Sequence, residues 1–181
     1  MNLPIDERVK AFLDVRDKPF CFNFDDRRQD GSSYTKAMNF CANMNNGGLR
    51  SRVVCCFFDW TQQEIFPSAL TAKMSAPRSC HFFTQVFIPE TQAYAYVDVT
   101  WDKGLSKAGF RVAMWDGLHS TPLAVDRPVI LSVDRSEEIV ATLSKLSGQE
   151  WRDLKDVREN FYRRVSSWVS AQRLGLKGYH A

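Results

Sequence analysis

The feature that most constrains the fold is a predicted β-hairpin in the middle of the chain. Residues 80–88 and 93–101 are rich in aromatic and β-branched side chains, and the short polar segment 89–92 separates them. Two runs of this kind joined by a short loop are typical of antiparallel strands connected by a tight turn. We therefore expect these two runs to form neighbouring strands of a sheet.

The hairpin register predicts that a histidine lies beside an aspartate. If Ile88 pairs with Ala93, His81 faces Thr100, and Asp98 lies two residues away on the partner strand. Side chains alternate between the two faces of a strand, so positions two apart share a face, and diagonal neighbours are within reach of each other. A loop with an even number of residues keeps this relation, whereas a bulge would break it.

Such a pair has two interpretations. A carboxylate beside a histidine fixes the tautomer of the imidazole and stabilises its cation, which is the orienting half of a nucleophilic triad. The structural alternative is a histidine that is hydrogen-bonded within a sheet.

Helical periodicity is predicted on both sides of the hairpin. Helices are expected at 4–15, from Ser32 or Ser33 to Gly47, from a capping box at Asp134 and Glu137 to Gly148, and at about 150–173. Further strands are expected at 52–58, 110–115 and 129–133, and 61–77 is expected to be a loop with one helical turn at most. This order predicts a single α+β domain with a mainly antiparallel sheet.

Composition gives no sign of nucleic acid, membrane or metal as a partner. The net charge is only +3, from 24 basic and 21 acidic residues. No stretch approaches the roughly 18 apolar residues that a membrane helix needs. The spacing of Cys80, His81 and His119 fits no zinc ligand pattern, and no cofactor is expected. Five cysteines without a CxxC spacing favour a reducing, cytoplasmic location.

A helix start is a good position for a nucleophile. The helix dipole and the free N–H groups lower the pKa of a thiol there and can hold an oxyanion. Gly31, Ser32 and Ser33 precede a helix with a well-defined apolar stripe, which gives such a position. A plain serine N-cap is the structural alternative.

Four segments in this order resemble the transglutaminase-like (papain-like) superfamily. They are GSSYTKA (31–37), GLRSRV (48–53), HFFTQVFI (81–88) and YVDVTW (96–101). The resemblance covers roughly residues 30–102. It aligns Ser33 with the family's nucleophilic cysteine, or Ser32 if the alignment is shifted by one residue. The catalytic histidine then corresponds to His81 and the aspartate to Asp98.

The resemblance implies a fold and a chemistry. The fold would be a papain-like core, with the nucleophile helix packed on an antiparallel sheet and with helices at the C-terminus. The chemistry would be attack on an amide or ester carbonyl of a peptide, amide or acyl-thioester, followed by transfer of the acyl group to water or to an amine. Gln29 would help to bind the oxyanion, and Trp60 and Trp101 would line a substrate groove.

Serine at position 33 is the main departure from the family pattern. A hydroxyl is far less acidic than a thiol, so a thiolate–imidazolium triad does not automatically activate it. Three explanations are open: a cysteine has been replaced by serine in this chain, the protein is a silent member that only binds, or Ser33 is itself a working nucleophile. The other cysteines are no substitutes, because Cys41, Cys55 and Cys56 are expected in the core and Cys80 on the face opposite His81.

Overall fold

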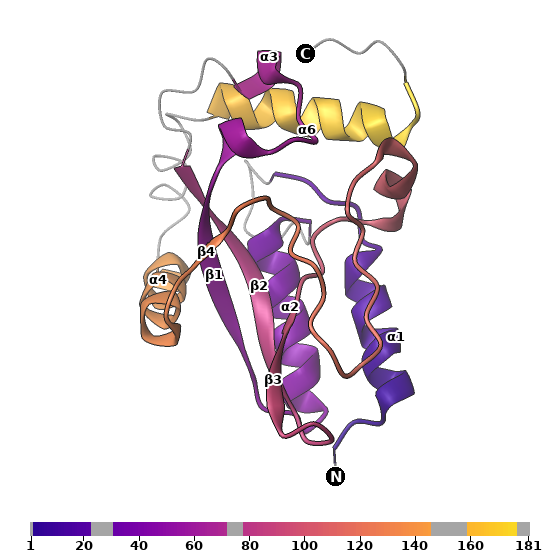
Figure 1. The fold of residues 1–181 in the computed structure, drawn as a ribbon, viewed down its shortest axis with the longest axis vertical. Coiled ribbons are helices and arrows are strands. Elements are labelled where there is room, and N and C mark those ends of the chain that lie inside the picture. Colours follow the sequence, from indigo (N-terminus) through magenta and orange to yellow (C-terminus); the bar gives the residue numbers. More distant parts are fainter. Residues whose placement is uncertain (1, 23–30, 72–77, 146–158, 177–181) are drawn as a thin grey trace.

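The computed structural model describes residues 2–22, 31–71, 78–145 and 159–176. Its centre is an antiparallel sheet of four strands in the order β3-β2-β1-β4 (Figure 1). The strands are β1 (Ser51–Asp59), β2 (Arg78–Ile88), β3 (Ala93–Val97) and β4 (Val129–Ile130). The helices are α1 (Ile5–Arg16), α2 (Ser33–Asn46), α3 (Ser68–Thr71), α4 (Val133–Lys145) and α6 (Glu159–Arg173), with 3-10 turns η1 (Trp60–Gln62) and η2 (Lys103–Ala108). The α+β class and the antiparallel sheet are as predicted.

The central hairpin has the predicted register. Ile88 pairs with Ala93, and the pairing of β2 with β3 runs without a bulge to Thr84 and Val97. The second strand is shorter than predicted and ends at Val97 rather than at residue 101. Pairing ends there because the Asp98 side chain accepts a hydrogen bond from the backbone N–H of Thr100, at 3.0 Å. The chain then leaves the sheet immediately after the aspartate.

One face of the sheet is covered by helices. α2 packs along β2, where Ala37 lies against Phe82 in one cluster and Phe40 and Met44 lie against Val86 in another. α1 packs on the outside of α2, with the rings of Phe12 and Phe40 6.1 Å apart. α4 covers the β1 side of the same face (Figure 1). The predicted apolar stripe of the helix that begins at Ser33 is thus the stripe that contacts the sheet.

The opposite face carries an aromatic core. Val54, Phe58 and Phe83 of β1 and β2 pack against side chains from the connecting segments and from α6. α6 lies across one end of the sheet, above the start of β2 (Figure 1). The connecting segments and helix add Trp60, Phe66, Trp101, Phe110, Val165 and Trp168 to this core. Because strand positions alternate between faces, His81 projects into the aromatic side and its neighbours Cys80 and Phe82 belong to the helical side.

The strand predicted at 110–115 is wrong. The backbone there is irregular, although Phe110, Ala113 and Trp115 are buried. The carbonyl oxygen of Ala113 accepts a hydrogen bond from the Arg16 guanidinium at 2.9 Å, instead of pairing with a strand. Residues 110–115 are therefore a connecting segment that inserts side chains into two core clusters.

Two further boundaries differ from the prediction. The strand predicted at 129–133 is reduced to the two residues of β4, because Ser132 turns the chain into α4 and accepts a hydrogen bond from the N–H of Ser136 at 3.0 Å. The helix therefore begins before Asp134, at Val133. Within the described part of the predicted loop at 61–77, the helical turn is α3, and the 3-10 turn η1 ends at Gln62; residues 72–77 lie outside the described residues. Gly148 and the first part of the last predicted helix lie outside the described residues.

Candidate active site

His81 and Asp98 form a buried pair. His81 Nε2 and Asp98 Oδ2 are 2.7 Å apart, and the two residues are 3% and 1% exposed. His81 comes from β2 and Asp98 follows the last residue of β3, so the diagonal relation expected from the hairpin is present. An ionised carboxylate can only accept hydrogen bonds, so Nε2 carries the proton and Nδ1 is left as the acceptor of the neutral ring.

The carboxylate of Asp98 is held in place by the backbone. Its Oδ2 also accepts from the N–H of Ala124 at 2.8 Å, and its Oδ1 accepts from the N–H of Thr100 at 3.0 Å. Burial alone would raise the pKa of Asp98, but the charge and hydrogen bond of His81, with the side-chain hydrogen bond of Thr100 and the backbone N–H of Ala124, outweigh burial and lower this pKa. The aspartate therefore remains ionised and fixes the ring of His81.

The start of α2 separates the roles of the two serines. Ser32 is the N-cap, and its Oγ accepts from the N–H of Thr35 at 3.2 Å while Thr35 Oγ1 accepts from the N–H of Ser32 at 3.1 Å. This capping box occupies the Ser32 hydroxyl. Ser33 is the first helical residue, and its side chain lines a cavity together with His81. Of the two candidates, Ser33 is thus the one that lines the same cavity as the histidine.

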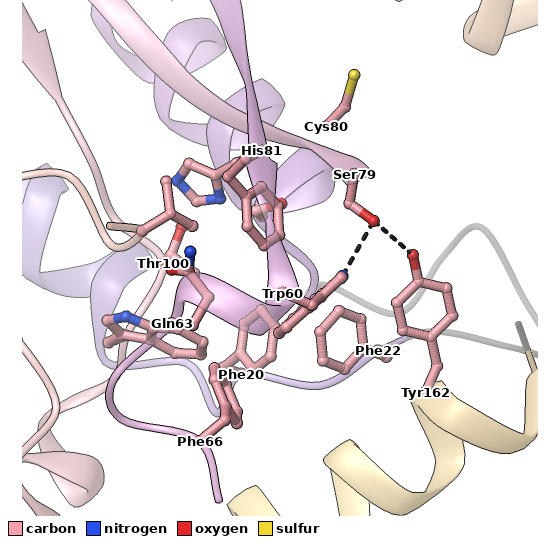
Figure 2. Close-up of a pocket in the computed structure, with 14 residues that line it drawn as sticks. Phe20, Phe22, Trp60, Gln63, Phe66, Ser79, Cys80, His81, Thr100 and Tyr162 are labelled. Atoms are coloured by element: carbon pink, nitrogen blue, oxygen red, sulfur yellow. Dashed lines mark hydrogen bonds between the residues drawn. The ribbon is translucent and has the colours of Figure 1, made fainter. Parts of the chain in front are cut away.

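The cavity is small and mostly aromatic. It has a volume of about 50 Å³, room for a few water molecules or a narrow chemical group. Figure 2 shows His81 at one end and the aromatic rings around the rest of the wall. Besides Ser33 and His81, the lining includes Phe20, Phe22, Trp60, Gln63, Phe66, Ser79, Thr100, Trp101 and Tyr162. Partial charges interact more strongly in such an apolar space than in water.

Trp60 and Trp101, the two tryptophans predicted to line a substrate groove, both line this cavity, and a hydrogen bond fixes each indole ring. Trp60 is 4% exposed and donates from Nε1 to Ser79 Oγ at 3.0 Å. Trp101 is 5% exposed and donates from Nε1 to the carbonyl of Ala124 at 3.0 Å. Gln29, the predicted oxyanion residue, lies outside the described residues.

A buried lysine near the site was missed by the sequence analysis. The Lys36 side chain is fully buried, and Nζ donates to the carbonyls of Arg16, Lys18 and Thr100, each at 2.8 Å. Burial lowers the pKa of Lys36 to about 8, although Asp102 and Asp98 act in the opposite direction. Lys36 therefore ties the first turn of α2 to the segment that carries Asp98. Its position next to Ala37 on the buried side of the helix was the available signal.

A second ion pair holds one wall of the cavity. Asp102 Oδ2 accepts from the backbone N–H of Phe20 at 2.9 Å and from Arg173 Nη2 at 2.8 Å. Arg173 Nη2 also donates to the carbonyl of Phe20 at 3.0 Å. Phe20 is thereby clamped between η2 and the C-terminal end of α6.

The five cysteines do not line the site as nucleophiles. Cys41, Cys55 and Cys56 are buried, and burial followed by the charge of Asp98 raises the pKa of Cys56 to about 12. Cys80 borders the cavity, but its thiol points away from it (Figure 2) and its hydrogen bond lowers the pKa of Cys55 to about 7. Cys21 lies between two lining residues without lining the cavity, and burial raises its pKa.

Comparisons of the chain with protein-family models, with curated proteins and with solved structures give no match. Among the helices that the structure describes, none has the length and apolar character required to cross a membrane.

Proposed function

We propose that this chain is a transglutaminase-like, papain-like acyl-transfer domain in which residue 33, His81 and Asp98 act together. The observation that carries the proposal is the buried His81–Asp98 pair, whose histidine lines the same cavity as the first residue of α2. The orientation of the pair agrees with this role. Nε2 faces the carboxylate, and Nδ1 is the nitrogen left to receive a proton.

The chemistry would proceed in two halves. The hydroxyl or thiol at position 33 gives its proton to His81 Nδ1 and attacks the carbonyl carbon of a peptide, amide or acyl-thioester. The imidazolium returns the proton to the leaving amine or thiolate as the bond to it breaks. Water or an amine then gives its proton to His81 and attacks the acyl carbon. The bond from this carbon to residue 33 breaks, and the oxygen or sulfur of residue 33 takes the proton back from the imidazolium. Asp98 stabilises the imidazolium in both halves without being protonated.

The helix start would contribute to the first step. Free N–H groups and the positive end of the helix dipole favour a negative charge on a nucleophile and on a developing oxyanion. A thiol benefits more than a hydroxyl because its anion is accessible near neutral pH. With serine at position 33, the site is therefore suited to slow acyl transfer or to binding without turnover.

The second candidate function is a transglutaminase-like binding module that lacks catalysis. Ser33 itself favours this candidate, because the partners His81 and Asp98 are in place while the thiol is not. Incubation of the unmodified chain with a fluorophosphonate, which labels activated serines, separates it from a working serine enzyme. Labelling of Ser33 that Asp98→Asn reduces would support the enzyme, and absence of labelling would support the binding module.

The experiment that tests the proposed site is the reactivity of a thiol introduced by Ser33→Cys. Its alkylation rate is measured against pH, with mass spectrometry to separate residue 33 from the native cysteines. We expect fast alkylation at about pH 6, well below the ordinary thiol pKa of about 8.5. His81→Ala should abolish this reactivity. Ser32→Cys is the matched control, because the adjacent position faces the capping box rather than the cavity.

The proposed site is wrong if the thiol from Ser33→Cys reacts no faster than the one from Ser32→Cys. It is also wrong if His81→Ala leaves the rate unchanged in a folded protein. If the reactivity is present, amide, ester and thioester donors are then tested with and without a primary amine. Product formation that depends on the amine would identify transfer, and product formation without it would identify hydrolysis.

A further inference from the structure

Burial divides the residues that line the cavity into an interior and a rim. Of the 14 described lining residues, ten are buried, and the partly exposed ones are Phe22, Ser33, Cys80 and Tyr162. We call these four residues the rim. In the described part of the chain, the entrance of the cavity therefore lies among them, and the proposed nucleophile at position 33 stands at this entrance.

Two of the rim residues are aromatic, and their rings stack. The ring centroids of Phe22 and Tyr162 are 4.8 Å apart, and the ring planes make an angle of 24°. Phe22 also packs against the buried ring of Trp60, with a centroid distance of 5.6 Å (Figure 2). The stacked pair thus extends the aromatic wall of the interior as far as the entrance.

Hydrogen bonds hold both rings in place. The Tyr162 hydroxyl lies 3.3 Å from Ser79 Oγ, which also accepts from Trp60 Nε1 at 3.0 Å (Figure 2). The backbone N–H of Phe22 donates to Ser166 Oγ at 3.3 Å. Since Tyr162 and Ser166 both belong to α6, this helix positions the two rings of the rim together.

The interior is not able to widen in compensation. Its volume is only about 50 Å³, and Trp60 and Trp101 are each fixed by a hydrogen bond from the indole N–H. Protein interiors are close-packed, so an additional methyl group displaces neighbouring side chains at a cost in free energy. A group that enters the cavity therefore has to fit the space that the walls leave.

We infer that the stacked rings of Phe22 and Tyr162 restrict the proposed site to narrow, unbranched acyl groups. This inference rests on the proposed acyl-transfer function and makes the two residues specificity residues of that site. An acyl carbon bonded to residue 33 lies at the rim, and its chain extends into the cavity. A branch next to this carbon meets the two rings, whereas a straight chain passes them.

The test compares two acyl esters on the thiol introduced by Ser33→Cys. The acyl chain of p-nitrophenyl butanoate is straight, and p-nitrophenyl 2-methylpropanoate carries the same atoms in a branched chain. The quantity measured is the straight-to-branched ratio of rate constants at residue 33, with mass spectrometry to locate the acyl group. We expect this ratio to exceed that of free N-acetylcysteine at least about tenfold, the lower end of discrimination by one methyl group in an apolar pocket.

Variants of the rim assign the discrimination to the rings. Adding Tyr162→Ala removes one ring and should lower the ratio about three- to tenfold. Adding Tyr162→Phe keeps the ring and should keep most of the ratio. Tyr94→Ala is the matched control, because Tyr94 is 40% exposed on β3 and does not line the cavity, and it should leave the ratio unchanged.

Equal ratios for residue 33 and for N-acetylcysteine would overturn the inference, as would a ratio that Tyr162→Ala lowers no more than Tyr94→Ala does. Thermal melting checks the fold of each variant. If Tyr162→Ala does not fold, Phe22→Val removes the other ring, and the same fall in the ratio is expected. A failure of the proposed function is seen separately, as slow reaction of the straight ester that His81→Ala does not change. The ratio is measurable for a slow thiol as well, so the two failures are distinguishable.

Discussion

At the scale of single residues, the properties of His81 depend on groups that lie outside the pair. Asp98 is ionised because two backbone N–H groups, from Thr100 and Ala124, add to the hydrogen bond from the histidine. These donors come from the segment after β3, which folds back over the aromatic face. The histidine is therefore oriented by the fold rather than by a single neighbour.

Asp98→Asn should lower the reactivity of the proposed site more strongly than it lowers the stability of the fold. The amide cannot accept from His81 Nε2, Thr100 and Ala124 as a charged carboxylate does, and it no longer stabilises the imidazolium. We expect the alkylation rate of the Ser33→Cys thiol at about pH 6 to fall at least tenfold. The loss of the buried hydrogen bonds should lower the free energy of unfolding by roughly 1–3 kcal/mol. Urea denaturation and alkylation of the same double variant measure both quantities.

The lowered pKa of Asp98 also predicts an acid-dependent stability. A carboxyl whose pKa lies below its ordinary value of 3.8 binds its proton less readily in the folded than in the unfolded state. Its contribution to stability is therefore complete above about pH 4 and is lost as pH falls below that value. Between pH 5 and pH 2 the unmodified chain should lose more stability than the Asp98→Asn variant. An equal loss of stability in both proteins would contradict the assignment of this pH dependence to Asp98.

At the scale of elements, the position of α2 is fixed by an unusual contact. Lys36 Nζ joins the first turn of this helix to the end of α1 and to the segment after β3 through three carbonyl oxygens. The same contact determines where Ser33 lies relative to His81. Removing the charged amine of Lys36 from water costs free energy. Its three hydrogen bonds to backbone carbonyl groups offset this cost.

Lys36→Met should destabilise the protein by about 2 kcal/mol, because two buried carbonyl groups and one partly buried carbonyl group lose their donor. Lys10→Met is the matched control, since Lys10 is an exposed lysine on α1.

The dependence of the free energy of unfolding on pH adds a second test of Lys36. The pKa of Lys36 is lowered from 10.5 to about 8, so between these values the unfolded chain binds the proton more readily than the folded protein does. The contribution of Lys36 to the free energy of unfolding should therefore rise as pH increases from about 8 towards 10.5. This rise should be absent in Lys36→Met, and its persistence would show that another group titrates.

The hairpin could be predicted from sequence because its information is local. The two strands, their turn and the pairing of Ile88 with Ala93 follow from alternation and from loop length. The capping serine before α2 was likewise a local signal. The end of β3 at Val97 was not, because it depends on the Asp98 side chain capping a nearby N–H group.

At the scale of the whole molecule, the site is assembled by contacts between distant segments. Phe20, from the connection between α1 and α2, is held by Asp102 and by Arg173 at the C-terminal end of α6. The walls of the cavity thus come from both ends of the chain. Neither hydrophobic periodicity nor motif spacing encodes such pairings, which is why the contacts of Lys36 and of Arg173 were not predicted. The irregular backbone at 110–115 was missed for the same reason.

Arg173→Ala should weaken the contact by which α6 and Asp102 hold Phe20. It leaves the carboxylate of Asp102, which is only 3% exposed, without its cationic partner. Breaking such a pair costs about 2–4 kcal/mol after allowance for the partial exposure of the arginine. The control is Arg135→Ala on α4, where the ion pair with Glu138 is exposed and is expected to contribute less than about 1 kcal/mol. Equal destabilisation of the two variants in urea would contradict the role of α6 as part of the cavity wall.

We propose that residue 33, His81 and Asp98 form one acyl-transfer site. It is tested most directly by acetyl transfer from p-nitrophenyl acetate to the thiol of the Ser33→Cys variant, with the modified residue located by mass spectrometry. We expect rapid acetylation of residue 33 that His81→Ala abolishes and that the Ser32→Cys thiol does not show. Acetylation of residues 32 and 33 at the same rate, or a rate that does not depend on His81, would contradict it.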